Sequence, residues 1–453
     1  HELTQYVKDN PDVLQLNWNA LYEANMNDLN ESTYENVNVN GNIQNFTGNR
    51  AKYLVTERRE DEKKFNFSTA VNTVLSKKVD LSFGFDYVNQ NKNFYQIAKD
   101  LLGADFHMNY NQFAERATSN QVISGLDTVR QHDLQNPDRV VFEGDRYGYD
   151  YNASIQYADV WATADFNFRK IDVFVQGKGS ITSFYRKGNN QSGLFIDDSF
   201  GKSEVQNFFN YGVKAGATYK INGRNFILAN GIYETRAPLF ANSFVSNRTR
   251  NQVVDGLESE QHFGGEFGYI LRADKLKLNF VGYYLQMRNL TETTPFYHDE
   301  ERTFVNYTLN GINRQHMGLE LAASYKLTKW LNLNAAAAYG KYTYISRPDA
   351  TVTIDNNSEI IRQETVYLKN YHVGNTPELA FTGGFGINYG NFFLNTNFNY
   401  TARNWIDVNS VRRTALALDL VPEGNLRDDI LYQEMYDNQF SIDLFAGYTW
   451  RLG

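Results

Sequence analysis

Residues 211–223 read YGVKAGATYKING, and this stretch decides the fold. Every second residue from Tyr211 to Tyr219 is aromatic, Val or Ala, whereas the residues between them are Gly, Lys or Thr. Successive side chains of an extended chain point to opposite faces, so this spacing makes one face apolar and the other polar. Asn222-Gly223 follows, and this pair between alternating segments is a strong hairpin signal. The stretch therefore predicts a β-strand that ends in a tight turn to an antiparallel partner.

The same alternation recurs along the chain. It is found at residues 81–88, 160–168, 319–327 and 442–448, and no segment keeps a 3.6-residue period. The predicted strands are about 10 to 15 residues long, whereas strands in globular proteins usually have about 5 or 6. A β-strand needs about 9 to 11 tilted residues to cross the hydrocarbon layer of a membrane. The strand length therefore favours an all-β transmembrane sheet.

The connections between the predicted strands alternate between short and long. Short turns are predicted at 76–78, 169–170, 222–223, 273–274, 328–329 and 390–391, and long polar segments at 90–150, 187–203, 238–258, 289–312, 347–376 and 407–437. This rhythm is typical of an antiparallel outer-membrane β-barrel with short periplasmic turns and long extracellular loops. We count about 13 strands, and residues 53–59 would add a fourteenth. Residues 1–52 and 90–150 are interpreted as extracellular loops.

The composition excludes several classes of protein. Of the 453 residues, 15% are aromatic, which is too many for a disordered chain. The absence of cysteine excludes a disulfide scaffold and a cysteine-based zinc site. The mean hydropathy is -0.54, and no apolar run reaches the ~18 residues of a spanning helix. A net charge of -8 with dispersed Lys and Arg argues against a nucleic-acid partner.

Catalytic signatures are missing from the sequence. No Gly-x-Ser-x-Gly elbow is present, and no spacing is typical of a metal or nucleotide site. We therefore expect no enzymatic activity, no cofactor and no bound metal.

The polar face of each predicted strand defines a first set of candidate residues. In a barrel that crosses a bilayer, the apolar residues face lipid and the polar residues line the lumen. Outer-membrane lipids are thus the expected partner of the apolar face. The residues expected to line the lumen are Asp86, Asp165, Lys214, Lys220, Glu320, Lys326 and Asn397.

The long segments supply a second set of candidates, because loops on a rigid scaffold often carry binding residues. Aromatic and Arg side chains suit stacking on a polar ligand and hydrogen bonding to a carboxylate or phosphate. The candidate ligand-binding residues are Arg248, Arg250, Phe296, Tyr297, His298, Arg412 and Arg413. An alternative remains open for each of them, namely that the side chain ties one loop to another.

Several short motifs carry a family resemblance. They are FEGDRYGYDY at 142–151, GKS at 201–203, NFFNYG at 207–212, NGRN at 222–225, TRAP at 235–238, FYHD at 296–299, FVNY at 304–307, HMGLEL at 316–321 and GNTP at 374–377. In combination they cover most of the chain, which resembles the TonB-dependent outer-membrane receptors of the Bacteroidetes type.

The resemblance implies a 22-stranded barrel in the bacterial outer membrane that holds an N-terminal plug. A TonB-type energy transducer opens such a barrel to admit a ligand bound outside. This sequence shows no plug segment or TonB-contacting box before the first strands, so residues 1–453 are interpreted as the C-terminal part of the barrel. Contact with the TonB-type transducer is expected through the missing N-terminal region.

Three functions remain open at this stage. Energised uptake of a ligand bound at the extracellular loops is the leading hypothesis. A passive porin would share the polar lumen and the loop rhythm. A structural or interaction barrel, whose loops dock a surface lipoprotein or a larger outer-membrane assembly, is the third.

Overall fold

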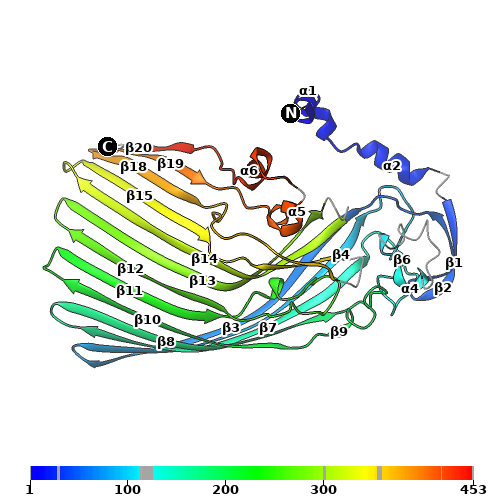
Figure 1. The fold of residues 1–453 in the computed structure, drawn as a ribbon, viewed down its shortest axis with the longest axis horizontal. Helices are drawn as coiled ribbons and strands as arrows, with labels where there is room; N and C mark the ends of the chain where they lie inside the picture. Colours follow the sequence, from blue (N-terminus) through cyan, green and yellow to red (C-terminus); the bar gives the residue numbers. More distant parts are fainter. Residues whose placement is uncertain are drawn as a thin grey trace.

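The computed structural model describes residues 2–27, 31–112, 114, 126–298, 303–354, 360–419 and 421–450. In this part of the chain, thirteen long strands follow one another across a single antiparallel sheet (Figure 1). In sheet order they are β3 (Val55–Ser76), β4 (Val79–Asp100), β7 (Arg146–Asn167), β8 (Ile171–Gly188), β10 (Gln206–Lys220), β11 (Asn225–Arg236), β12 (Glu260–Arg272), β13 (Leu276–His298), β14 (Thr303–Lys326), β15 (Leu331–Tyr344), β18 (Pro377–Tyr389), β19 (Phe392–Asn404) and β20 (Gln439–Tyr448). The all-β antiparallel fold is confirmed.

All six predicted short turns join neighbouring strands at one end of the sheet (Figure 1). In the turn from β10 to β11, the Asn222 Oδ1 accepts hydrogen bonds from the backbone N of Arg224 at 2.9 Å and of Asn225 at 3.0 Å. An Asn side chain that bonds to the backbone ahead of it stabilises a turn locally. The Asn-Gly signal therefore marks the hairpin correctly.

One face of the sheet carries exposed apolar side chains. Phe83, Val213 and Phe267 are 48%, 51% and 61% exposed, although each lies inside a long strand. Soluble proteins rarely expose apolar patches of this extent, because such surface is costly in water. The exposed apolar face is the one that the alternation assigns to lipid.

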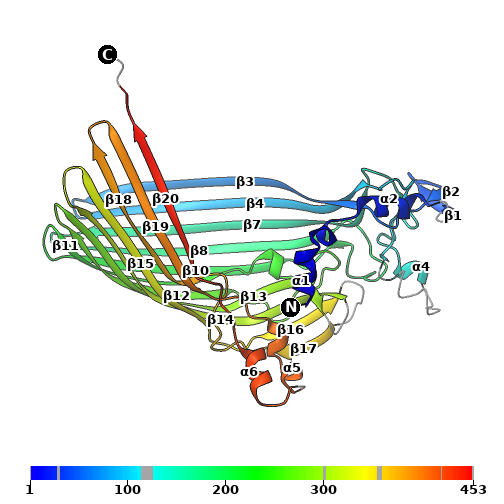
Figure 2. The same cartoon turned by 90° about the horizontal axis from the view of Figure 1, so that it is seen from above.

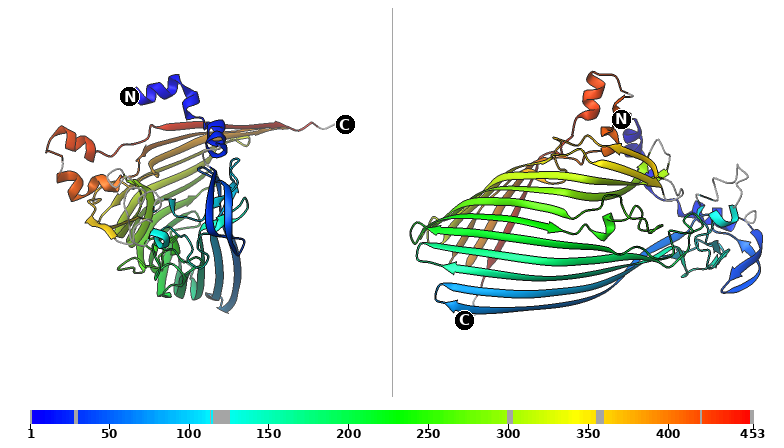
Figure 3. Two further views of the ribbon diagram at one scale, coloured as in Figure 1. Left: turned by 90° about the vertical axis from the view of Figure 1, so that its right-hand side faces the viewer. Right: turned by 60° about the horizontal axis from the view of Figure 1, so that its bottom comes forward.

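The strand register puts all seven predicted lumen residues on the opposite face. Asp86 pairs with Asp159, Asp159 with Ser180, and Ser180 with Asn210, so one polar row crosses four strands. Followed strand by strand, the same register places the other six on this face: Asp165, Lys214, Lys220, Glu320, Lys326 and Asn397. Hollows of about 710 and 340 Å³ open there, and Figure 3 shows the curl of the sheet. It is the concave face, and its role as a lumen lining stays a prediction.

Three predicted boundaries are wrong. Residues 53–59 form no fourteenth strand, because Val55–Arg59 begins β3. The segment 90–150 is shorter as a connection, since β4 continues to Asp100 and β7 starts at Arg146. Its polar residues look like a loop, but they pair with the charged start of β3, where Glu62 faces Lys92. Residues 289–298 and 303–312 also belong to strands, which extend the β13–β14 hairpin to His298 and Thr303.

The remaining elements lie away from the short turns. They are α1 (Glu2–Asp9), η1 (Pro11–Leu14), α2 (Trp18–Met26), β1 (Glu31–Val39), β2 (Asn42–Asn49), β5 (His107–Met108), α4 (Leu126–Val129), β6 (Val140–Val141), β9 (Gly201–Lys202), η3 (Phe240–Asn242), β16 (Asp349–Ile354), β17 (Ile360–Thr365), η4 (Ser410–Arg413), α5 (Ala415–Asp419) and α6 (Asn425–Leu431). Figure 2 shows α2, β1, β2 and α4 beyond the far ends of β3, β4 and β7. Among the described residues, no helix is both long and apolar enough to cross a membrane.

Small apolar cores hold these outer segments together. Val37 and Val39 of β1 pack with Phe106, Met108 and Val140, which are all almost completely buried. A second core joins the extended β13–β14 hairpin to β16 and to the segment around Val366 and Leu368. The described part of the segment 1–52, predicted as a loop, thus contains two α-helices, one 3-10 helix and a hairpin that packs on its neighbours.

Candidate functional site

A cavity of about 470 Å³ lies where the concave face meets the outer segments. Its walls come from the ends of β3, β4, β7 and β8 that lie opposite the short turns. The connection between β4 and β7 and the segments that follow β8 and η3 complete the walls. Cavities of this size are typical of small-ligand sites. We call it the outer cavity.

The strands β3, β4 and β7 form the floor of the outer cavity. Arg58 pairs in register with Gln96, and Gln96 with Tyr147, so the three side chains lie in one row across the sheet. The register shifts between Tyr95 and Gln96, where β7 carries Gly148 with a φ of +68°. A side chain at Gly148 would collide with Gln96, because an ideal Cβ there lies 2.0 Å from the Gln96 Nε2. The glycine thus allows both the positive φ at this register shift and the close approach of Gln96.

The wall before β3 is fixed by one side chain of α2. Asn25 is completely buried, and its Oδ1 accepts hydrogen bonds from the backbone N of Lys52 at 2.9 Å and of Tyr53 at 3.1 Å. Its Nδ2 donates to the carbonyl oxygens of Tyr53 at 2.8 Å and Leu101 at 2.7 Å. Because the amide uses both its donor and its acceptor atoms, it holds Lys52 and Tyr53 against the connection after β4.

The wall at β8 is built on a buried cation. Arg186 is 2% exposed, and its guanidinium donates to the carbonyl oxygens of Asn247 at 2.6 Å and Ser199 at 3.0 Å and to the Asn251 Oδ1 at 2.6 Å. It also lies over the Tyr151 ring, 5.0 Å from the centroid. Burial lowers the pKa of Arg186 to about 10, which still leaves the side chain charged at neutral pH. A positive charge is thus held under the cavity by neutral oxygens.

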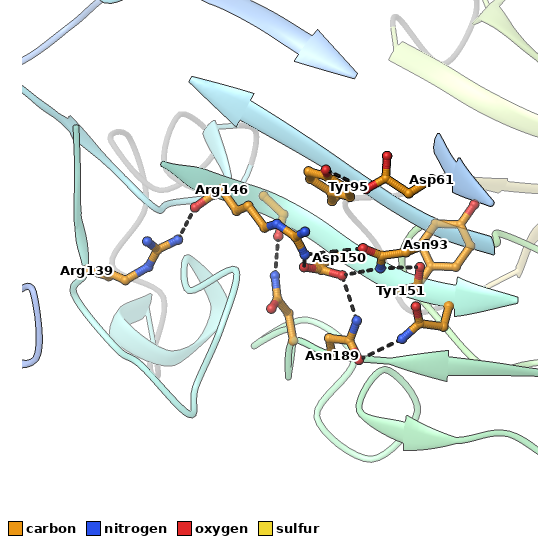
Figure 4. A network of polar contacts seen from close by, with 11 residues as sticks. Asp61, Asn93, Tyr95, Arg139, Arg146, Asp150, Tyr151 and Asn189 are labelled. Atoms are coloured by element: carbon orange, nitrogen blue, oxygen red, sulfur yellow. Dashed lines mark hydrogen bonds and ion pairs between the residues drawn. The ribbon is translucent and has the colours of Figure 1, made fainter. Parts of the chain in front are cut away.

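Among the described residues that line the outer cavity, the one acid is already paired. Asp150 forms an ion pair with Arg146 at 2.8 Å, and it accepts hydrogen bonds from Asn189 at 2.6 Å and Asn93 at 3.0 Å (Figure 4). Figure 4 shows Asp150 enclosed by these three partners, with Arg146 beside Tyr95. The Asp150 charge is therefore taken up within the wall.

The other charged groups described along the outer cavity are all cationic. Lys52, Arg58, Arg186 and Arg248 line it. Within the described ranges, none of these four side chains forms an ion pair with a carboxylate. Lys52, Arg58 and Arg248 are exposed and so can reach a ligand.

Histidine and tyrosine supply hydrogen bonds without adding charge. Burial is the main reason that the pKa of His132 falls to about 4, and repulsion by the neighbouring His107 contributes. The His132 ring is therefore neutral at pH 7. Burial raises the pKa of Tyr110 and of Tyr147, and these phenols therefore keep their protons. The outer cavity thus combines four positive charges with neutral donors and acceptors.

One of the seven predicted ligand-binding residues, Arg248, lies in the outer cavity. Arg250 is 1% exposed; it lies over the Phe195 ring and donates to the Ile354 carbonyl at 3.4 Å. Arg413 is also buried, and it donates to the carbonyls of Leu431 and Tyr432. Both contacts fit the alternative that these arginines tie loops together.

The other predicted residues lie elsewhere. Phe296, Tyr297 and His298 are in the paired end of β13 rather than in a loop, and Phe296 packs against the core around Val305 and Tyr307. Arg412 is exposed in η4. A role of any of these four in ligand binding stays a prediction.

Most of the outer cavity was missed by sequence reasoning. Arg58 lies inside a strand, and its side chain reaches the cavity because β3 continues beyond the apolar band. Arg186 likewise lies near the end of β8. One signal was available: the motif FEGDRYGYDY contains Tyr147 and Tyr149, and both line the cavity.

Comparisons with known proteins bear on the fold. No protein-family model matches the sequence, and neither does any curated protein. Among solved structures, the chain is similar to the copper transporter OprC, with 13% identity and a TM-score of 0.58 over 87% of this chain and 49% of that one.

Two further solved structures are similar. The ferric yersiniabactin uptake receptor FyuA from Yersinia pestis has 9% identity and a TM-score of 0.52, covering 89% of this chain and 49% of its own. The siderophore receptor PiuA from Acinetobacter baumannii has 12% identity and a TM-score of 0.53, covering 86% and 50%. The chain spans about half the length of these structures. Over that half, it shares their antiparallel β-barrel fold.

Proposed function

We propose that this chain is the barrel portion of an outer-membrane receptor that takes up a ligand bound in the outer cavity. One observation carries the proposal. The outer cavity lies at the far end of the concave polar face, on a sheet whose other face is apolar and exposed. A ligand bound there would stand at the mouth of the space that the concave face encloses.

The likeness in fold to receptors and transporters supports this role. Those proteins are named for copper, ferric yersiniabactin and siderophores, and these ligands are theirs. For the present chain, location in the bacterial outer membrane, contact with outer-membrane lipids and energised opening by a TonB-type transducer all belong to the proposal. The Bacteroidetes-type assignment belongs to it too and rests on the sequence motifs. We propose transport without enzymatic activity.

The proposal is tested on the native gene product extracted from membranes. We expect it to fractionate with the outer membrane and to form a cross-link with the TonB-type transducer of the same cell. In a liposome-swelling assay with small sugars, we expect no swelling, because an energised receptor stays closed at rest. Swelling without a cross-link would favour a passive porin instead.

A second function is favoured by a separate observation. The segment from η1 to α2 presents Leu14, Leu16 and Trp18 to solvent at 70%, 58% and 50% exposure. Apolar side chains that are clustered on an outer segment suit contact with another protein. An interaction barrel that docks a surface lipoprotein or a larger assembly would use them. Recovery of a stoichiometric lipoprotein in detergent, lost in Leu16→Asp, would support this function.

A further inference from the structure

We propose that the outer cavity binds a soluble ligand with acidic groups at two separate positions. The inference rests on the proposed receptor function and names the ligand class of the same site. The described residues supply the charge balance, the placement of the cations and the side from which a ligand arrives.

The charge balance requires an anion. Lys52, Arg58, Arg186 and Arg248 line the outer cavity, and Asp150, the one acid among its described lining residues, is paired with Arg146 at 2.8 Å. A cluster of like charges repels itself, and a bound anion relieves that repulsion. Arg suits carboxylate and phosphate groups in particular, because its planar donors can bind two oxygens at once. Arg186 is held by neutral oxygens and lies near Asp198, so the charges left for a ligand are those of the exposed Lys52, Arg58 and Arg248.

The cations lie on two sides of the cavity, so they predict where the acidic groups of a ligand would bind. Lys52 and Arg58 belong to the wall at β3, whereas Arg186 lies in β8 and the Arg248 guanidinium lies 5.9 Å from the centroid of the Tyr149 ring of β7. The sheet order β3, β4, β7, β8 puts two to three strand spacings between the two groups, which is about 10 to 14 Å. Gln96 of β4 lies between them and is neutral. The ligand should therefore carry acidic groups near both ends and a polar middle.

The position of the cavity favours a soluble anion over a lipid headgroup. Arg58 and Gln96 lie on the concave face, and the apolar side chains that suit lipid lie on the opposite face. A headgroup of the surrounding bilayer would approach the apolar face, because its acyl chains stay in the hydrocarbon layer. The four cations therefore face away from the bilayer.

Binding is measured on the purified native gene product in a neutral detergent at low salt, by calorimetry. The probes are N-acetyl-triglutamate, citrate and tripolyphosphate, with N-acetyl-triglutamine as the neutral match of the first. We expect at least one anionic probe to bind about tenfold or more tightly than triglutamine, and its affinity to fall as salt is added. If no anionic probe binds more tightly than triglutamine, the proposal is overturned.

Dihexanoylphosphatidic acid presents a lipid phosphate to the same site. We expect it to bind more weakly than the best soluble anion. If it binds more tightly, the assignment to a soluble ligand is overturned.

The chain offers a matched pair of variants at successive positions of β3. Arg58 lines the outer cavity, whereas Arg59 lies on the opposite face and pairs with Glu57 at 2.8 Å. We expect Arg58→Gln to weaken binding of the anion about tenfold or more, and Arg59→Gln to leave it unchanged. Arg58→Lys should restore part of the affinity. Equal losses in both Gln variants, or no loss in Arg58→Gln, would contradict the proposal.

Two controls keep the outcomes distinct. Arg58 makes no ion pair within the described residues, so Arg58→Gln should unfold at the same denaturant concentration as the parent. Cross-linking to the TonB-type transducer does not depend on the ligand class. A native product that forms the cross-link but ignores all anions would overturn only the ligand class, whereas one that binds anions without a cross-link would overturn the uptake function.

Discussion

Phe83 and Ser82 are neighbours in β4 that meet different surroundings. Phe83 lies on the apolar face and is 48% exposed, five residues from the turn, whereas Ser82 lies on the concave face. An Arg on the lipid face at the middle of the bilayer costs about 2 to 4 kcal/mol. We expect Phe83→Arg to lower the free energy of unfolding in lipid vesicles by that amount, and Ser82→Arg to lower it much less. Equal losses would contradict the assignment of the faces.

Glu378 is a buried acid whose removal should also be costly. Its side chain is 0% exposed and accepts hydrogen bonds from the His372 Nδ1 at 2.7 Å, the Arg403 Nη2 at 3.0 Å and the Trp405 Nε1 at 3.1 Å. It also accepts one from the backbone N of Tyr342 at 3.0 Å. Breaking a buried pair by removing one partner costs about 3 to 5 kcal/mol, and the partial exposure of Arg403 reduces this.

We therefore expect Glu378→Ala to lower the free energy of unfolding by about 2 to 4 kcal/mol, measured by urea titration. Glu423→Ala is the control, because the Glu423 side chain is 93% exposed and lies 3.9 Å from its partner Arg427. An exposed pair of this kind contributes at most about 1 kcal/mol. A loss below 1 kcal/mol in Glu378→Ala would show that the hydrogen bonds of Glu378 to His372, Arg403 and Trp405 do not stabilise the fold.

At the scale of elements, α2 is attached to the wall of the outer cavity through Asn25. The backbone amides of Lys52 and Tyr53 both donate to its Oδ1. We expect Asn25→Ala to speed hydrogen exchange of these two amides at least tenfold, because each buried hydrogen bond contributes about 1 kcal/mol or more and leaving a donor unpaired costs further. Asn19→Ala, an exposed position of the same helix, should leave their exchange unchanged. Unchanged exchange in Asn25→Ala would mean that another contact holds this wall.

The elements also show what a sequence can and cannot reveal. The strands and turns near the lipid band follow from alternation, since an apolar side chain is needed at every second position there. Above that band both faces meet water and polar neighbours, so alternation disappears while the backbone stays paired. Alternation therefore assigns 90–100, 289–298 and 303–312 to loops although they belong to strands. The outer cavity was hidden for the same reason, because Arg58 and Arg186 lie in such polar strand ends.

The candidate residues illustrate a second limit. An Arg in a polar segment is an equally good candidate for binding a ligand and for binding carbonyl oxygens of a neighbouring loop. Arg248 is exposed in the outer cavity, whereas Arg250, two residues later, is buried against Phe195. Tertiary packing alone separates these two positions, because their local sequence surroundings are nearly the same.

At the scale of the whole molecule, the sheet has two free edges. The order runs from β20 to β3, and among the described residues no strand pairs with the outer side of either. Figure 3 shows the two edge strands apart from each other. In lipid each unpaired backbone group costs several kcal/mol, so both edges need partner strands, from further polypeptide or from a second copy.

This requirement leads to a prediction about residues 1–453 produced alone. Refolded in detergent, they should not give a closed monomeric barrel. Closure would have to pair β3 directly with β20, the two ends of the sheet order. The sheet would have to curl more tightly than it does to bring these two edges together. A closed barrel resists dodecyl sulfate until it is heated, so its electrophoretic mobility changes on boiling. We expect no such change for residues 1–453 and a clear change for the native gene product under the same conditions. A monomer of residues 1–453 with heat-modifiable mobility would show that these strands close on themselves. Phe440 and Ile442 of β20, which are 73% and 66% exposed, would then lie on the outer surface of a smaller closed barrel.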